Sequence, residues 1–248
     1  MRGFIQIFKM DLENIIKNPV LVGYNTVFAV LSILIIGFLT SGSYANAADA
    51  YNYYAVTFLI FSIMNGAMTA TNCFMERDIK KPNLRIIHSP VGSFPIYFSK
   101  ILSSAIFDFV CHLLVMAILI PLLNLNFGGI YVYYIILLMV PFEFAAAALG
   151  TMFCCIFKTE ETASTLLSTF ISILAFLGGT FFSLDGMGGT LAFASRLSLV
   201  KWLTDAFFSI IFDSNISSFL PLFIGGAAVS VLLVLGCKKF FKTEDYLC

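Results

Sequence analysis

The chain has 248 residues, of which 60% are hydrophobic, 11% are charged and 28 are phenylalanine. Charged residues make up roughly a quarter of a soluble domain, so this composition excludes a soluble enzyme, a disordered chain and a small disulfide scaffold. The 14 basic and 14 acidic residues balance, which leaves no net basic field for binding a nucleic acid. The sequence therefore predicts an integral membrane protein.

Residues 1–18 predict an amphipathic helix. Phe4, Phe8 and Leu12 recur at helical spacing, and Ile15 continues the apolar stripe. The charged side chains expected on the opposite face are Arg2, Lys9, Asp11, Glu13 and Lys17. Such a helix lies in the membrane interface with its apolar face toward the acyl chains. An ordinary juxtamembrane anchor fits the segment equally well.

Six apolar runs are long enough to cross a hydrocarbon layer of ~30 Å, which requires roughly 20 residues. They are Val20–Thr40, Tyr51–Phe74, Ile101–Leu123, Ile130–Phe157, Thr162–Phe182 and Ser217–Cys237. The runs are continuous rather than alternating, which excludes a transmembrane β-barrel. We expect an all-α membrane protein whose residues 1–248 form a single transmembrane domain.

The segment 183–215 is also apolar, but it carries Arg196, Lys201 and Asp205. Each of these charges would cost about 2.5–3.5 kcal/mol at the centre of a membrane-spanning helix. With six spans and a cytoplasmic N-terminus, every basic residue except Arg196 and Lys201 lies on the cytoplasmic side, as the positive-inside rule requires. We therefore expect 183–215 to lie on the outer side, dipping into the membrane as short re-entrant helices, and both termini to be cytoplasmic.

The loop between the second and third spans, residues 75–100, carries concentrated charge of both signs. Asn83 can cap a short helix in which Leu84 and Ile87 form an i, i+3 apolar pair, and Ser89-Pro90 ends it. A short helix with an exposed apolar pair is suited to a groove on another protein. A merely solvated charged loop is the alternative.

The same loop contains Glu76-Arg77-Asp78, the apolar pair, Ser89-Pro90-Val91 and Tyr97…Lys100. Taken in this order, these motifs resemble those of ABC-2 type permeases, the membrane subunits of a class of ABC exporters. The resemblance covers essentially the whole chain and includes 194–212 with its Lys201-Trp202 pair. One departure is the segment 78–82, where the family more often has an acidic residue followed by a Gly-Thr-like pair.

This resemblance implies an N-terminal elbow helix (1–18), a coupling helix in the loop 75–100 and re-entrant outer helices (183–215). It implies two copies of an ABC ATPase and a second permease subunit, in a homodimer or a heterodimer, in a bacterial plasma membrane. No cofactor is expected in this chain, which has no Gly-Lys pair of a phosphate-binding loop; ATP and Mg would bind to the ATPase. The residues expected to contact the ATPase are Glu76, Arg77, Asp78, Leu84, Arg85, Ile87, His88, Ser89 and Pro90.

Three ionisable residues fall within the predicted spans. Asp108 and His112 are one helical turn apart, so they share a face and can form a hydrogen bond, and Glu143 lies on the next span. Such groups usually face a bundle interior or an aqueous cavity, which makes them, with Asn65 and Asn72, candidates for a translocation path. The alternative is a bond between spans, with Asp108 as the expected partner of His112.

The predicted function is export of an amphipathic or hydrophobic compound (an antimicrobial peptide, a drug or a lipid-like molecule) driven by a separate ATPase. The alternative is a secondary transporter in which Asp108, His112 and Glu143 relay protons. As the membrane subunit of a transporter, the chain is not expected to be an enzyme, and no metal site is expected. Its two histidines do not fit the HExxH spacing, which excludes an intramembrane metalloprotease of that type. Its six cysteines are expected to be buried as small hydrophobic residues.

Overall fold

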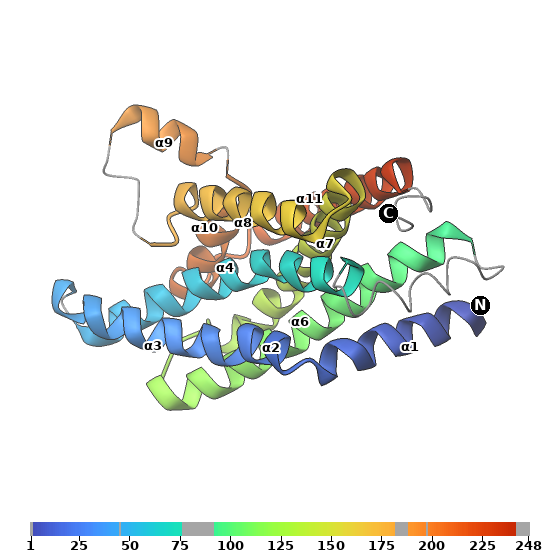
Figure 1. Cartoon of the computed structure of the whole chain (residues 1–248). Helices are drawn as coiled ribbons and strands as arrows, with labels where there is room; N and C mark the ends of the chain where they lie inside the picture. The colour runs from blue at the N-terminus through green and yellow to red at the C-terminus, as the bar shows by residue number, and fades with distance from the viewer. Residues whose placement is uncertain (1, 45, 76–91, 182–187, 197, 242–248) are drawn as a thin grey trace.

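The computed structural model describes residues 2–44, 46–75, 92–181, 188–196 and 198–241. Within these ranges the chain is helical and contains no strand (Figure 1). Six of the described helices are long and apolar enough to cross a membrane, which confirms the number predicted from the sequence. They are Pro19–Ser43, Ala48–Met75, Ser93–Leu123, Gly129–Phe157, Glu160–Leu177 and Phe219–Phe240.

The N-terminal helix α1 (Arg2–Lys17) is separated from the first span by a capped break. The Asn18 side chain accepts a hydrogen bond from the backbone N–H of Val20 at 3.0 Å, and Pro19 occupies the first helical position, where its missing N–H costs nothing. The first span then consists of α2 (Pro19–Gly23), the π-helix η1 (Tyr24–Phe28), α3 (Ala29–Thr40) and the 3₁₀-helix η2 (Ser41–Ser43).

Helix α4 (Ala47–Met75) is the central element of the bundle. It packs against the first span, α6 (Ser93–Leu123), α7 (Val132–Phe157), α8 (Glu160–Leu177) and α10 (Leu199–Phe212). The approach to α7 is closest at Gly150, where an added Cβ would lie 2.0 Å from the carbonyl oxygen of Ala67. The small residues of α7 therefore allow close packing within the chain, as small residues commonly do between membrane helices.

Two spans differ most from the prediction, one at its start and one at its end. Helix α6 begins at Ser93 rather than near Ile101, because Pro95 is tolerated in a first helical turn and the charge of Lys100 is neutralised within the bundle. The predicted loop 75–100 therefore overlaps this helix. Helix α8 ends at Leu177 rather than Phe182, because Gly179 takes a φ of +79°, which side-chain-bearing residues rarely adopt.

Two shorter helices, α9 (Gly189–Arg196) and α10, lie between α8 and α11 (Phe219–Phe240). Helix α10 buries one apolar face, which includes Leu203 and Phe207, against α4 and α8. Its charges form an ion pair, with Lys201 Nζ 2.9 Å from Asp205 Oδ1. Helix α11 packs chiefly on α7, and most of its remaining surface is apolar and exposed.

Candidate functional site

A cluster of polar side chains lies inside the bundle, where α4, α6 and α7 meet. Asp108 and His112 on α6 and Glu143 on α7 are all almost completely buried. The structure therefore brings together the three ionisable residues that the sequence singled out within the spans. Buried ionisable groups within membrane helices require partners, and each of the three has at least one.

His112 connects α6 to both of its neighbours. Its Nδ1 lies 2.5 Å from Glu143 Oε1 on α7, and its Nε2 lies 2.7 Å from Ser62 Oγ on α4. The expectation that Asp108 is the partner of His112 is wrong, although the two residues lie on one face of α6. The physical reason is that both ring nitrogens are already engaged by adjacent helices. The alternative interpretation, a bond between spans, is the arrangement found.

Asp108 instead connects α6 to α4 and, through it, to the first span. Thr69 Oγ1 donates to Asp108 Oδ1 at 2.9 Å, and Asn25 Nδ2 donates to Thr69 Oγ1 at 3.0 Å. Asn25 lies in the π-helix η1 and is fully buried. The sequence analysis did not identify Asn25, although a lone amide in an apolar span was a usable signal.

Of the two asparagines that the sequence analysis grouped with these residues, one lies at the edge of the cluster and the other lies outside it. Asn65 is buried at its edge, where its Nδ2 donates to its own helix at Phe61 O and its Oδ1 accepts from Tyr24 OH at 3.2 Å. Among the described residues, Asn72 donates only to Met68 O, one turn back on α4, and it lies outside the cluster.

Gly66 makes room for two carboxylates. A Cβ added at Gly66 would lie 2.8 Å from Asp108 Oδ2 and 3.4 Å from Glu143 Oε2. These two oxygens are buried and have no hydrogen-bond partner in the part of the chain that the structure describes. The second carboxylate oxygens of both residues therefore lie close together beside Gly66 on α4. A shared proton or a polar group placed there would supply their missing hydrogen bonds.

Replacing Glu143 with alanine should destabilise the protein by about 1–3 kcal/mol, because His112 would keep its buried position without its partner on α7. The measurement is the midpoint of thermal unfolding in detergent. Asn72→Ala is the matched control, since that amide bonds only its own helix, and it should leave the midpoint nearly unchanged. Equal shifts for the two variants would contradict the role assigned to Glu143.

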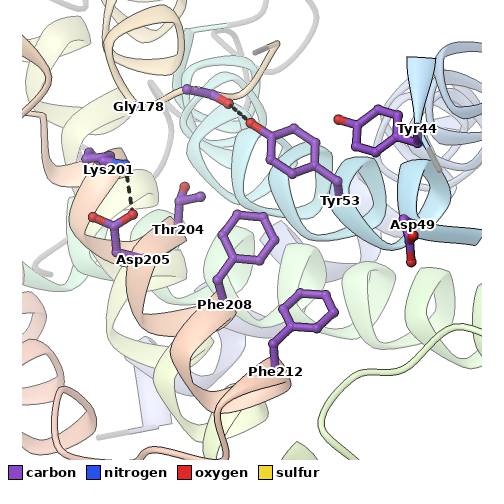
Figure 2. A pocket seen from close by; sticks show the side chains of 10 residues that line it. Tyr44, Asp49, Tyr53, Gly178, Lys201, Thr204, Asp205, Phe208 and Phe212 are labelled. Atoms are coloured by element: carbon purple, nitrogen blue, oxygen red, sulfur yellow. Dashed lines mark hydrogen bonds and ion pairs between the residues drawn. The ribbon is translucent and has the colours of Figure 1, made fainter. Parts of the chain in front are cut away.

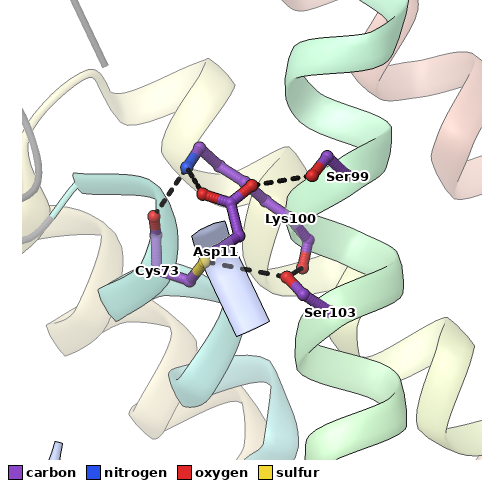
Figure 3. Close-up of polar contacts among 5 residues, drawn as sticks. All are labelled: Asp11, Cys73, Ser99, Lys100 and Ser103. Atoms are coloured by element: carbon purple, nitrogen blue, oxygen red, sulfur yellow. Dashed lines mark hydrogen bonds and ion pairs between the residues drawn. The ribbon is translucent and has the colours of Figure 1, made fainter. Parts of the chain in front are cut away.

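A second buried polar site joins α1 to the C-terminal end of α4 and to the N-terminal part of α6 (Figure 3). Lys100 Nζ on α6 lies 2.9 Å from Asp11 Oδ1 on α1 and donates to the carbonyl oxygen of Cys73 on α4 at 3.1 Å. Ser99 Oγ donates to the other oxygen of Asp11 at 2.7 Å. The side chains of Asp11 and Lys100 are both fully buried.

The position of Asp11 corrects the sequence analysis, which placed it on the charged face of the N-terminal helix. The buried face of α1 is centred on Ile7, Asp11 and Ile15, while Ile5 and Ile16 are exposed. A carboxylate can occupy this face because Lys100, 89 residues later, neutralises it. Figure 1 shows α1 running alongside α6.

The loop residues predicted to contact an ATPase lie outside the described residues. They are Glu76, Arg77, Asp78, Leu84, Arg85, Ile87, His88, Ser89 and Pro90. The described helices nevertheless define where this segment attaches, since 76–91 connects the last turn of α4 to the first turn of α6. The Asp11–Lys100 site holds both of these helices.

Five cysteines are buried, as predicted: Cys73, Cys111, Cys154, Cys155 and Cys237. Among the residues that the structure describes, no three His, Cys, Asp or Glu side chains form a group that could hold a metal ion.

A family model described as ABC-2 type transporter matches residues 2–212. The chain belongs to the ABC-2 type transporter family. It is a multi-pass membrane protein and a transporter permease, and its 248 residues contain no ATPase domain. A search of curated proteins gives no significant match. Permeases of this family work with ABC ATPase subunits. The match ends at the last residue of α10, and α11 follows it.

Proposed function

We propose that this permease exports an amphipathic or hydrophobic compound and is driven by a separate ABC ATPase. Family membership carries this proposal, together with six apolar helices that match the transmembrane part of such a transporter. Two ATPase copies would bind ATP and Mg, and a second permease subunit, identical or similar, would complete the path. The apolar outer surfaces of α8 and α11 suit contact with lipid or with that second subunit.

The proposed coupling helix lies in 76–91, with the pair Leu84 and Ile87 seated in a groove of the ATPase. Closure of the ATPases would displace this segment, and α4 and α6 would receive the motion because they flank it. The Asp11–Lys100 ion pair supports this route. It ties both flanking helices to α1 through a buried contact, so the three helices would move as one unit.

In the proposed orientation, both termini and 76–91 lie in the cytoplasm, and α9 and α10 lie on the outer side. The first and last helices carry basic residues at the end assigned to the cytoplasm, including Lys17 and the pair Lys238 and Lys239. This distribution agrees with the positive-inside rule. Helix α1, with Ile5 and Ile16 exposed, would lie in the interface as an elbow helix, and α9 and α10 would be the re-entrant helices.

Within this scheme the Asp108, His112 and Glu143 cluster sets how α4, α6 and α7 pack. The proton-relay alternative rests on the two unpartnered carboxylate oxygens at Gly66. The two interpretations differ in energy source. A proton relay would support transport by a pH gradient in vesicles that contain no ATP, whereas an ABC permease requires ATP hydrolysis.

Replacing both Leu84 and Ile87 with aspartate should leave the protein inserted but reduce ATP-dependent transport by about tenfold or more, because two buried charges cannot be accommodated in an apolar groove. The test is to purify the tagged permease in mild detergent, identify a stoichiometric ATPase, and measure ATP hydrolysis and transport in vesicles.

The matched control is Ile86→Asp, which adds a charge beside the apolar pair but not on its predicted face. It should retain most of the transport. Unchanged transport in the double variant would refute the coupling helix. Purification of a fully inserted permease without any ATPase, together with transport driven by a pH gradient, would refute the ABC mechanism as a whole.

A further inference from the structure

A pocket of about 420 Å³ lies at the end of α4 that is remote from the Asp11–Lys100 site (Figure 2). The lining residue Asp49 and the buried Cys73 are 24 positions apart on α4, which corresponds to about 36 Å along a helix. The first turns of α4, the residues after α8 and one face of α10 form the walls. The volume is within the range of small-molecule sites.

Aromatic rings form one wall of this pocket. The rings of Tyr53 and Phe208 stack with their centroids 5.3 Å apart, and Tyr44 and Phe212 extend this row at both ends. The Tyr53 hydroxyl donates to the carbonyl oxygen of Gly179 at 2.8 Å, which fixes that ring across the gap between α4 and α8. A rigid aromatic wall favours a flat apolar group or a cation placed over a ring face.

Among the described residues that line the pocket, one carboxylate has no cation beside it. Lys201 and Asp205 neutralise each other at 2.9 Å. Asp49 is exposed at the wall, and its hydrogen bond from Asn46 is long, at 3.5 Å. Among the described residues, no basic group lies within ion-pair distance of Asp49. The described lining residues therefore combine an aromatic surface with one net negative charge.

We propose that this pocket binds the transported compound at the outer end of the path, and that the compound is an amphipathic organic cation with a flat apolar part. The cationic group would face Asp49 and the ring faces of Tyr44 and Tyr53, while the apolar part would lie along Phe208 and Phe212. This inference rests on the proposed function, because the orientation of the exporter makes this the outer side. It restricts the transported compounds to one charge class.

Rhodamine 6G and fluorescein provide a matched pair of probes, because they share a flat ring system and carry opposite charges. The purified permease is placed in lipid nanodiscs, and dye binding is measured by fluorescence anisotropy against empty nanodiscs. We expect saturable binding of rhodamine 6G and much weaker binding of fluorescein. Asp49→Asn and Phe208→Leu should each weaken rhodamine 6G binding by about three- to tenfold.

Asp213→Asn is the matched control. Asp213 is an exposed carboxylate that follows α10 at the same end of the bundle but does not line the pocket, and its loss should leave the affinity unchanged. Equal affinities in the Asp49→Asn and Asp213→Asn variants, absence of saturable rhodamine 6G binding, or equal binding of fluorescein would each overturn the proposal. Transport by the permease–ATPase complex is a separate readout. ATP-driven transport that is insensitive to Asp49→Asn refutes the pocket assignment alone, whereas no ATP-driven transport in the unmodified complex refutes the proposed function.

Discussion

Replacing Gly150 with alanine should destabilise the protein by about 3 kcal/mol or more, which is the upper part of the range for overpacked cores. The new methyl group would lie 2.0 Å from the carbonyl oxygen of Ala67 and 2.8 Å from its carbonyl carbon. Both are backbone atoms of the central helix, so no rotamer change can relieve the clash, and α4 and α7 would have to separate.

The measurements are the fraction of monodisperse protein in size-exclusion chromatography and the thermal midpoint in detergent. Gly225→Ala on α11 is the matched control, because nothing lies within 4 Å of its added Cβ. Alanine is also the better helix former, so this variant should be at least as stable as the original protein. Similar behaviour of the two variants would show that α4 and α7 are not in such close contact.

Replacing Lys100 with methionine should cost about 3–5 kcal/mol, because the Asp11 carboxylate would stay buried without its counter-charge. Ser99 alone would remain to satisfy it. The double variant Asp11→Leu with Lys100→Met should recover most of the lost stability, since an apolar pair of similar size often replaces a buried ion pair without penalty. Thermal midpoints of the two variants in detergent test both expectations.

Lys9→Met is the control for this pair. Lys9 forms an exposed contact with Glu13 at 3.9 Å, and such surface pairs contribute little, about 0–1 kcal/mol. A single Lys100→Met variant as stable as Lys9→Met would contradict the buried pair. The double variant could also regain stability without regaining ATP-dependent transport. That result would show that the ion pair transmits motion in addition to holding α1 in place.

The sequence was sufficient to locate the six spans, because each contains an apolar run of the required length. It was less reliable at their ends. The start of α6 was missed by eight residues because Lys100 looked like a loop residue, and only a partner 89 positions earlier makes its burial possible. The periodicity of hydrophobic residues does not reveal an ion pair between residues so far apart in the chain. Asp11 was placed on the wrong face of its helix for the same reason.

The sequence predicted which ionisable residues form the intramembrane site, but it did not predict which hydrogen bonds they make. Ionisable residues in apolar spans are rare enough to identify Asp108, His112 and Glu143 from the sequence. The partner of His112 depends on how α7 is rotated relative to α6, and helix rotation is set by packing rather than by the local sequence. The outer pocket was not foreseen, since its walls come from three elements that are distant in the chain.

The placement of α11 has a consequence for how the protein assembles. This helix rests chiefly on α7. Two of its side chains form polar contacts with that helix: the Ser230 hydroxyl donates to the carbonyl oxygen of Pro141 at 2.9 Å, and the Cys237 thiol donates to the carbonyl oxygen of Ala148 at 3.6 Å. Gly226 lets it approach the ring of Phe142. Because insertion of such a helix needs only its own hydrophobicity, whereas docking needs a formed partner surface, we expect α11 to enter the bilayer independently and to associate laterally with a bundle that is already folded.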